Sequence, residues 1–153
     1  MVAYLVAGDL DISTTLELMH QFVLSGVDII ELGVPFTDPI AEGPIIQAAH
    51  DRALQANTSL DMIFSLVEEF RSKDSETPVI LMGYINTFLA NSKALESIHE
   101  RGTDAVLIVD VPGESSLEDI GIQNKNIASI SLISPTTDND RIQKICMSSS
   151  GFI

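Results

Sequence analysis

The sequence predicts an α/β fold built around a parallel sheet. Short apolar runs rich in Val and Ile recur along the chain, and most of them do not alternate with polar residues. Strands of a parallel sheet show this pattern because both of their faces are buried. Longer amphipathic segments separate the runs, so that a strand–loop–helix unit repeats roughly every 25 to 45 residues.

The expected strands are the apolar runs themselves, each four to seven residues long. They lie at residues 2–6, 27–32, 79–82, 105–109 and 127–133. Residues 151–153 are expected to begin a sixth strand.

Two of the expected helices show a clear apolar face. One covers residues 13–26 with Gly26 as its C-cap, and the other covers residues 59–73 with Ser59 as its N-cap. The apolar faces consist of Leu16, Met19, Phe22 and Val23 in the first, and of Met62, Ile63, Leu66, Val67 and Phe70 in the second. Further helices are expected at residues 92–102, at 138–150 with Asp138 or Asn139 at the start, and weakly at 116–126, where Gly121 interrupts.

Two architectures fit this order of elements, an open doubly wound sheet and a (β/α)8 barrel. No G-x-G-x-x-G motif follows the first strand, which weakens a dinucleotide-binding interpretation. A complete barrel takes about 250 residues, whereas this sequence has 153. Because no linker divides the chain, residues 1–153 are expected to form one partial domain.

Composition disfavours several classes of function. The net charge is −14, from eight basic and twenty-two acidic residues, which argues against binding nucleic acid or an anionic membrane. The single cysteine, Cys146, allows no internal disulfide and is expected to be a core thiol. The chain shows no basic signal-peptide start and no apolar run of membrane-spanning length, so a cytoplasmic protein is expected.

The segment most informative about function is "ELGVPFTDPIAEGP", residues 31–44. Glu31 stands near the carboxyl end of the second expected strand among apolar neighbours, so desolvation should raise its pKa toward a range suited to proton transfer. Asp38 and Glu42 follow on a loop that prolines stiffen. Function lies at the carboxyl ends of strands in either architecture, so we expect Glu31 and Glu42 to divide acid and base roles.

Other interpretations of these residues stay open. A glutamate at a strand end often caps or forms an ion pair, and aspartate before proline is common in turns. A metal site at Glu31, Asp38 and Glu42 is disfavoured, because no histidine lies on the loop and the calcium-loop pattern is absent. The histidines fall on expected helices away from strand ends and are assigned no chemistry: His20, His50 and His99.

The longer segment "ELGVPFTDPIAEGPIIQAAHDRAL", residues 31–54, closely resembles the signature segment of the tryptophan synthase alpha chain family. Further matches follow in the family's order at residues 3–9, 78–86, 102–112, 131–137 and 148–153. The resemblance covers the whole chain and favours the TIM (β/α)8 barrel family, here a partial barrel of about five βα units plus the start of strand six.

The resemblance implies a lyase that cleaves indole-3-glycerol phosphate to indole and glyceraldehyde 3-phosphate, in the last steps of L-tryptophan biosynthesis. It implies neither cofactor nor metal in this chain, because pyridoxal phosphate belongs to a partner beta chain in an α2β2 heterotetramer. The family's acid/base glutamate falls on Glu31. The family's aspartate that accepts the indole N–H falls on Glu42, whose extra methylene requires another rotamer or a shifted loop.

Other roles follow from the resemblance position by position. Substrate-binding residues are expected at Tyr4, Tyr84, Leu107 and Phe152, the last where the family usually has tyrosine. Contacts with the beta chain are expected at Pro35, Asp38 and Asn86.

The sequence also departs from the family pattern. The mobile loop after strand six, the phosphate-binding loops after strands seven and eight, and the N-terminal helix have no counterpart in it. The chain is therefore expected to be part of a longer enzyme, a catalytically inactive truncated fragment, or a half-barrel that acts as a binding or assembly module. Another phosphosugar lyase or isomerase of the barrel class is a weaker rival.

Overall fold

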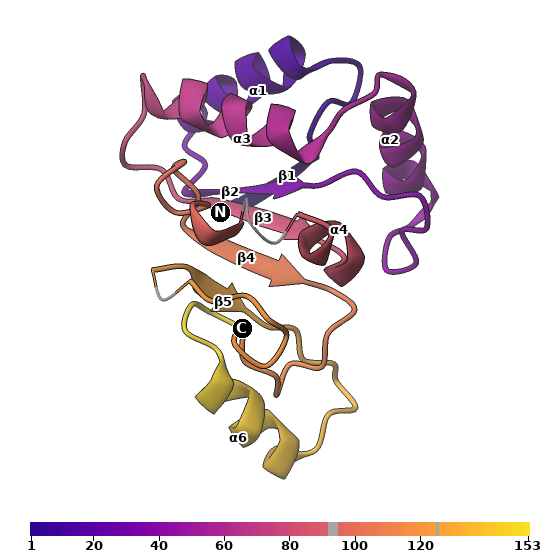
Figure 1. The fold of residues 1–153 in the computed structure, drawn as a ribbon, viewed down its shortest axis with the longest axis vertical. Helices are drawn as coiled ribbons and strands as arrows, with labels where there is room; N and C mark the ends of the chain where they lie inside the picture. The colour runs from indigo at the N-terminus through magenta and orange to yellow at the C-terminus, as the bar shows by residue number, and fades with distance from the viewer. Residues whose placement is uncertain (92–94, 125) are drawn as a thin grey trace.

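The computed structural model describes residues 1–91, 95–124 and 126–153. Its centre is a sheet of parallel strands in the order β1-β2-β3-β4-β5 (Figure 1). Each strand pairs with the next one along the chain, whereas a doubly wound sheet reverses its strand order at a switch point. The parallel α/β fold is confirmed as a partial barrel, with strands β1 (Val2–Val6), β2 (Ile29–Gly33), β3 (Val79–Gly83), β4 (Ala105–Ile108) and β5 (Ala128–Ile130).

The helices begin at residues suited to capping. The side chains of Asp11, Ser59 and Asp138 accept backbone N–H bonds at the starts of α1, α3 and α6. Figure 1 shows α1 and α3 side by side over one face of the sheet, α2 next to the end of β1, and α6 beside β5. The helices are α1 (Ile12–Leu24), α2 (Pro44–Gln55), α3 (Leu60–Arg71), α4 (Ile85–Leu89) and α6 (Asn139–Ser148).

The face of the sheet under α1 and α3 carries the main hydrophobic core. Leu32, Leu81 and Val106 are register partners on neighbouring strands, and all three are buried in this core. Phe64 and Phe70 of α3 pack in the same cluster and are fully buried. Burial of such large apolar side chains makes the dominant contribution to the stability of the fold. It holds the sheet in place, and the other face of the sheet is left to carry the site.

The opposite face of the sheet carries the predicted acid/base residue. Glu31 pairs in register with Tyr4 on β1 and with Ile80 on β3, so the three side chains share one row. Leu107 lies two residues further along β4 from the partner of Ile80 and is packed in the same apolar cluster as Ile80. The site is therefore built on the face that α1 and α3 leave free.

The structure corrects three expected elements. Residues 116–124 form turns and irregular chain rather than a weak helix, and Gly121 has a left-handed φ of 85° that ends a helical path. Residues 97–102 also form turns, while residues 92–94 of the same expected helix lie outside the described residues. Residues 151–153 form no strand, although the N–H of Gly151 donates to the carbonyl of Ser129 in β5.

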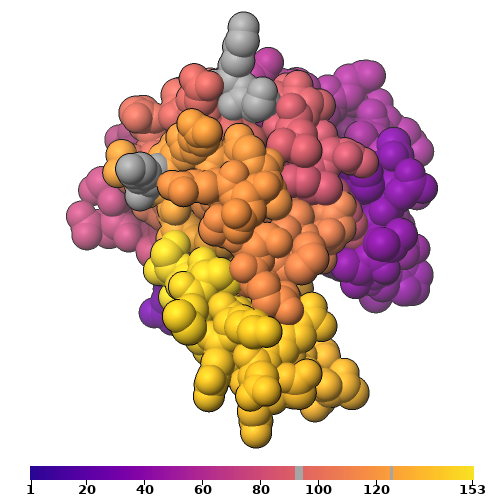
Figure 2. Space-filling view, turned by 60° about the horizontal axis from the view of Figure 1, so that its bottom comes forward, coloured from indigo at the N-terminus to yellow at the C-terminus, as the bar shows by residue number. Residues whose placement is uncertain are grey.

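The prediction that Cys146 is a core thiol is wrong. Cys146 is exposed, whereas its neighbour Ile145 is the residue that α6 buries. Figure 2 shows α6 and the chain end, in yellow, projecting beyond the rest of this face of the molecule. Among the described residues, no helix combines the length and the apolar character needed to cross a membrane.

Candidate active site

Glu31 offers a carboxylate in a poorly solvated place near the end of β2. Its side chain is half-buried between Tyr4 and Ile80 on the neighbouring strands. Burial raises the pKa of this carboxyl above its ordinary value of 4.5. Within residues 1–91, 95–124 and 126–153, no group hydrogen-bonds to the carboxylate, so Glu31 is free to give and take a proton.

Glu42 is held at one oxygen and free at the other. Its side chain is only 6 % exposed, and Oε2 accepts a short hydrogen bond from the Tyr84 hydroxyl. Oε1 has no hydrogen-bond partner in the described part of the chain, and Nε2 of His50 lies 4.0 Å from it. A buried oxygen without a partner costs stability, and it is an acceptor ready for an N–H donor of a ligand.

Tyr84 connects residues 34–43, the acidic loop that carries Asp38 and Glu42, to the end of β3. Its hydroxyl accepts a hydrogen bond of 2.9 Å from the N–H of Ala41 while donating to Glu42. Its ring stacks on Phe36 at 4.6 Å between centroids. Burial, together with the hydrogen bond to Glu42, raises the pKa of Tyr84 to about 12, so the hydroxyl stays a donor at neutral pH. The loop that carries Glu42 is therefore fixed at both its start and its end.

Tyr4 lies close enough to both carboxylates for their charges to act on its hydroxyl. Burial raises the pKa of its hydroxyl, and the charges of Glu42 and Glu31 raise it further. The hydroxyl reaches over β2 because position 33 is glycine: a Cβ on Gly33 would lie 2.3 Å from it. Gly33 is therefore required by close approach rather than by a turn.

His50 belongs to the site, and the prediction that it lies away from the strand ends is wrong. Its residue surface is 1 % exposed, its Nδ1 accepts from the N–H of Phe36 at 3.1 Å, and its Nε2 lies 3.4 Å from the Tyr4 hydroxyl. Burial lowers the pKa of the ring below its ordinary value of 6.5. A helical stripe could have revealed it, since His50 shares the i, i+3, i+4 spacing of the inward-facing residues of α2: Ile46, Ala49 and Ala53.

The other two histidines lie elsewhere in the fold. His20 packs on α1 with its ring stacked on Phe70 at 5.1 Å. His99 is exposed, although it lies in a turn and not in the helix expected for it.

Comparison with known proteins identifies a family that matches the chain over its whole length. The family model described as "Tryptophan synthase alpha chain" matches residues 1–153. The chain belongs to the tryptophan synthase alpha chain family. Relatives with that name include those of Hydrogenovibrio crunogenus, 44 % identical over 158 residues, and Nitrosomonas europaea, 42 % identical over 156 residues. All of this chain is covered in both, but only 57 % of each relative.

Solved tryptophan synthase structures agree with the architecture. The alpha subunit from Legionella pneumophila strain Paris superposes with a TM-score of 0.91 at 40 % identity, over 99 % of this chain and 60 % of that one. A tryptophan synthase complex from Pyrococcus furiosus gives 0.89 at 36 % identity, over 99 % and 63 %. A structure of the P. furiosus α2β2 complex gives 0.90 at 35 % identity. The chain therefore spans somewhat more than half of its alpha-chain relatives.

The remaining residues singled out by resemblance to the alpha-chain family lie in different surroundings. Leu107 is buried on the Glu31 face, whereas Phe152 is 42 % exposed. Of the expected beta-chain contacts, Pro35 is buried, and Asp38 and Asn86 are exposed. Their roles stay predictions.

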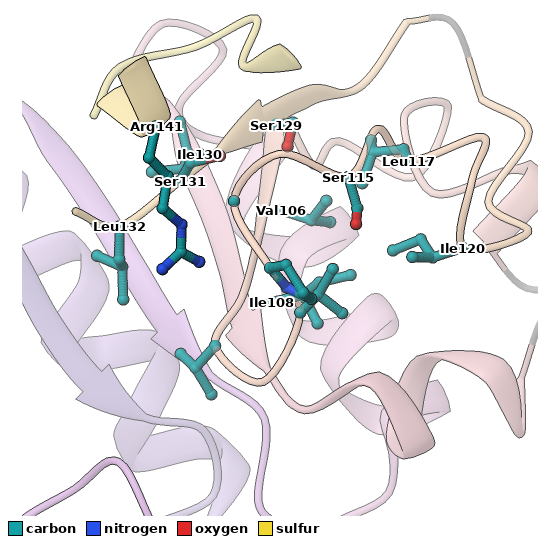
Figure 3. Close-up of a pocket in the computed structure, with 14 residues that line it drawn as sticks. Val106, Ile108, Ser115, Leu117, Ile120, Ser129, Ile130, Ser131, Leu132 and Arg141 are labelled. Carbon is teal, nitrogen blue, oxygen red and sulfur yellow. The ribbon is translucent and has the colours of Figure 1, made fainter. Parts of the chain in front are cut away.

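A separate hollow of about 150 Å³ lies beside β4 and β5 (Figure 3). Its lining includes Val106, Ile108, Ser131 and Arg141, and none of the alpha-chain residues predicted from the sequence. The guanidinium of Arg141 is already paired with Glu114. The described residues also hold no cluster of three His, Cys, Asp or Glu side chains placed to bind a metal. Glu31 and Glu42 stay the predicted acid/base residues.

Proposed function

We propose that this chain carries the acid/base site of a lyase that cleaves indole-3-glycerol phosphate to indole and glyceraldehyde 3-phosphate. The observation that carries the proposal is a pair of carboxylates in unlike environments on β2 and its following loop. Glu31 is half-buried, free of hydrogen bonds among the described residues, and has a raised pKa. Glu42 is buried with one oxygen fixed and the other free. Membership of the alpha-chain family supports the substrate.

Glu31 would act as the acid and then the base. Its protonated form gives a proton to C3 of the indole ring, and the ring nitrogen takes up the developing positive charge. The resulting carboxylate removes the proton of the hydroxyl on the carbon attached to C3. The bond between the two carbons breaks, its electrons restore the aromatic ring, and the aldehyde leaves. A carboxyl whose pKa is raised by burial suits both transfers.

Glu42 would stabilise the charge that appears on the ring nitrogen. Its free Oε1 accepts the indole N–H, and this hydrogen bond strengthens as the nitrogen becomes positive. An interaction that is stronger in the transition state than with the substrate raises the rate of the chemical step. The bond from Tyr84 holds the other oxygen and so restricts the positions that the carboxylate can take.

The partner and the setting follow from the same function. These proton transfers need neither a metal nor an organic cofactor in this chain, and the pyridoxal phosphate would belong to a beta chain. The exposed Asp38 and Asn86 would contact that chain, and the buried Pro35 would support the contact loop. We expect the protein to act in the cytoplasm, as an enzyme of amino-acid biosynthesis.

The test is release of indole from indole-3-glycerol phosphate in the presence of a beta chain. We expect the wild-type chain and the matched control Glu17→Gln, an exposed position on α1, to release indole at similar rates. Glu31→Gln should lower the rate by about 10²- to 10⁴-fold, because it removes the acid and base. Unchanged turnover in Glu31→Gln, or no indole from the wild-type chain, would overturn the proposal.

A further inference from the structure

We propose that His50 is a positioning residue for the Glu42 carboxylate, acting as a neutral imidazole with its proton on Nε2. The inference rests on the proposed function, in which Glu42 accepts the indole N–H. Its basis is a chain of contacts that joins three parts of the fold. The ring of His50 on α2 contacts Phe36 on the acidic loop and the Tyr4 hydroxyl on β1. Its Nε2 also lies 4.0 Å from Oε1 of Glu42.

The tautomer follows from the contact with Phe36. A backbone N–H can only donate, so Nδ1 of His50, at 3.1 Å, must present its lone pair. In the neutral ring the proton then lies on Nε2, which faces the Tyr4 hydroxyl at 3.4 Å and Oε1 of Glu42 at 4.0 Å. The ring is 1 % exposed, and turning it over would leave the N–H of Phe36 without its acceptor.

Glu42 needs a second support because one hydrogen bond does not orient a carboxylate on a three-bond side chain. Tyr84 fixes Oε2, and no hydrogen bond from the described residues reaches Oε1. The N–H of His50 stands 4.0 Å from Oε1, which is too long for a hydrogen bond. The N–H therefore attracts Oε1 and favours the observed orientation of the carboxylate, although it forms no hydrogen bond with this oxygen. Oε1 stays open for a ligand.

A charged His50 would undo this arrangement. A protonated Nδ1 is a donor and cannot accept the hydrogen bond from the N–H of Phe36, so two N–H groups would face each other and repel. The positive ring would also attract Oε1 of Glu42 away from the ligand. The Tyr4 hydroxyl and Glu42 of the loop face the ring, and the charge of Asp51, the next residue on α2, also acts on it. Glu31 and Tyr84 act in turn on the Tyr4 hydroxyl. Glu42 and Asp51 favour the charged ring, but burial outweighs them and lowers the pKa of His50 below its ordinary value, which favours the neutral ring at pH 7.

The role predicts an effect on kcat that a conservative variant rescues. His50→Leu keeps the bulk and removes both nitrogens, and indole release should fall by about 10- to 100-fold, the scale of a carboxylate misplaced by about 1 Å. His50→Gln can still donate toward Tyr4, so most of kcat should return, and the loss of activity at acid pH should move to lower pH. His99→Leu is the matched control, because it makes the same change at an exposed position.

Two results would overturn the proposal by kinetics. One is a wild-type kcat in His50→Leu. The other is an equal loss in His50→Leu and His50→Gln with an unchanged pH profile, because that pattern marks a packing role alone.

Nitrogen-15 NMR of the histidine rings tests the proposal without turnover, and it also decides the case if His50→Leu fails to fold. We expect His50 in the wild-type chain to carry its proton on Nε2 at pH 7, and to take up a second proton with a pKa below its ordinary value of 6.5. A proton on Nδ1, or a charged ring at pH 7, would overturn the proposal. The expected tautomer together with no indole release from any variant would instead locate the failure in the proposed function.

Discussion

The hydroxyl of Tyr4 lies 3.4 Å from Nε2 of His50, although 46 residues of chain separate them. This contact joins the first strand to the helix that follows the acidic loop. It passes over Gly33 at the end of β2, where a side chain would collide with the phenol. Three segments therefore meet over Gly33, and each of them can be tested by removing one contact.

Gly33→Ala should destabilise the chain and displace the phenol of Tyr4. The new Cβ would lie 2.3 Å from the Tyr4 hydroxyl and 2.8 Å from Cζ, so the ring must move. Overpacking of this kind costs about 1 to 3 kcal/mol, which urea unfolding would measure. Gly43→Ala is the control, because no atom lies within 4 Å of a Cβ built there. Equal unfolding midpoints for the two variants would contradict the prediction.

Glu31→Gln should make the chain more stable at neutral pH and leave stability at pH 4 nearly unchanged. Burial raises the pKa of Glu31 in the folded state above 4.5, so the folded state binds the proton more tightly than the unfolded state. This contribution is present below pH 4.5 and is lost as pH rises through the folded pKa. Glutamine stays neutral and avoids the loss.

The measurement for Glu31→Gln is the free energy of unfolding as a function of pH. Glu17→Gln supplies the baseline for the same change at an exposed position. A gap between the variants that is as large at pH 4 as at pH 7 would show that burial of the charge is not the cause.

Much of the fold could be predicted from local pattern, and the failures have a common physical origin. The apolar runs located all five described strands to within a few residues, because strands buried on both faces need continuous Val and Ile. Glu31 was placed correctly near the end of β2 for the same reason. Local pattern does not say how a helix docks. Cys146 and Ile145 are neighbours on α6, yet docking buries only Ile145.

His50 shows the same limit within the site. Its place on the inward stripe of α2 can be read from spacing, but its meeting with Tyr4 depends on the path of residues 34–43, which returns the helix to the end of β1. That path is held by contacts between distant residues, such as Ala41 with Tyr84. The turns at 116–124 were missed because short apolar spacing does not distinguish a weak helix from successive turns.

Tyr84→Phe should loosen the acidic loop while keeping the stacked ring. The change removes the donor to Glu42 and the acceptor for the N–H of Ala41, and it leaves the contact with Phe36. Loss of bonds to buried polar groups costs about 1 to 3 kcal/mol, measured by urea unfolding. In a double-mutant cycle with Glu42→Ala the two losses should be less than additive, because both remove the same bond. Additive losses would contradict a direct bond between Tyr84 and Glu42.

Tyr4→Phe should weaken substrate binding through His50. Without the hydroxyl, the Nε2–H of His50 loses its closest acceptor and can turn toward Oε1 of Glu42, now 4.0 Å away. Oε1 would then be occupied, so the indole N–H has to compete for it, and KM should rise together with a fall in kcat. Indole release measures both constants, and ¹⁵N NMR should show the His50 N–H in a stronger hydrogen bond. Tyr4→Phe in the background of His50→Leu provides the control, because the competing donor is then gone. If the loss on removing the hydroxyl is as large in that background as in the wild type, the hydroxyl acts on the substrate directly and not through His50.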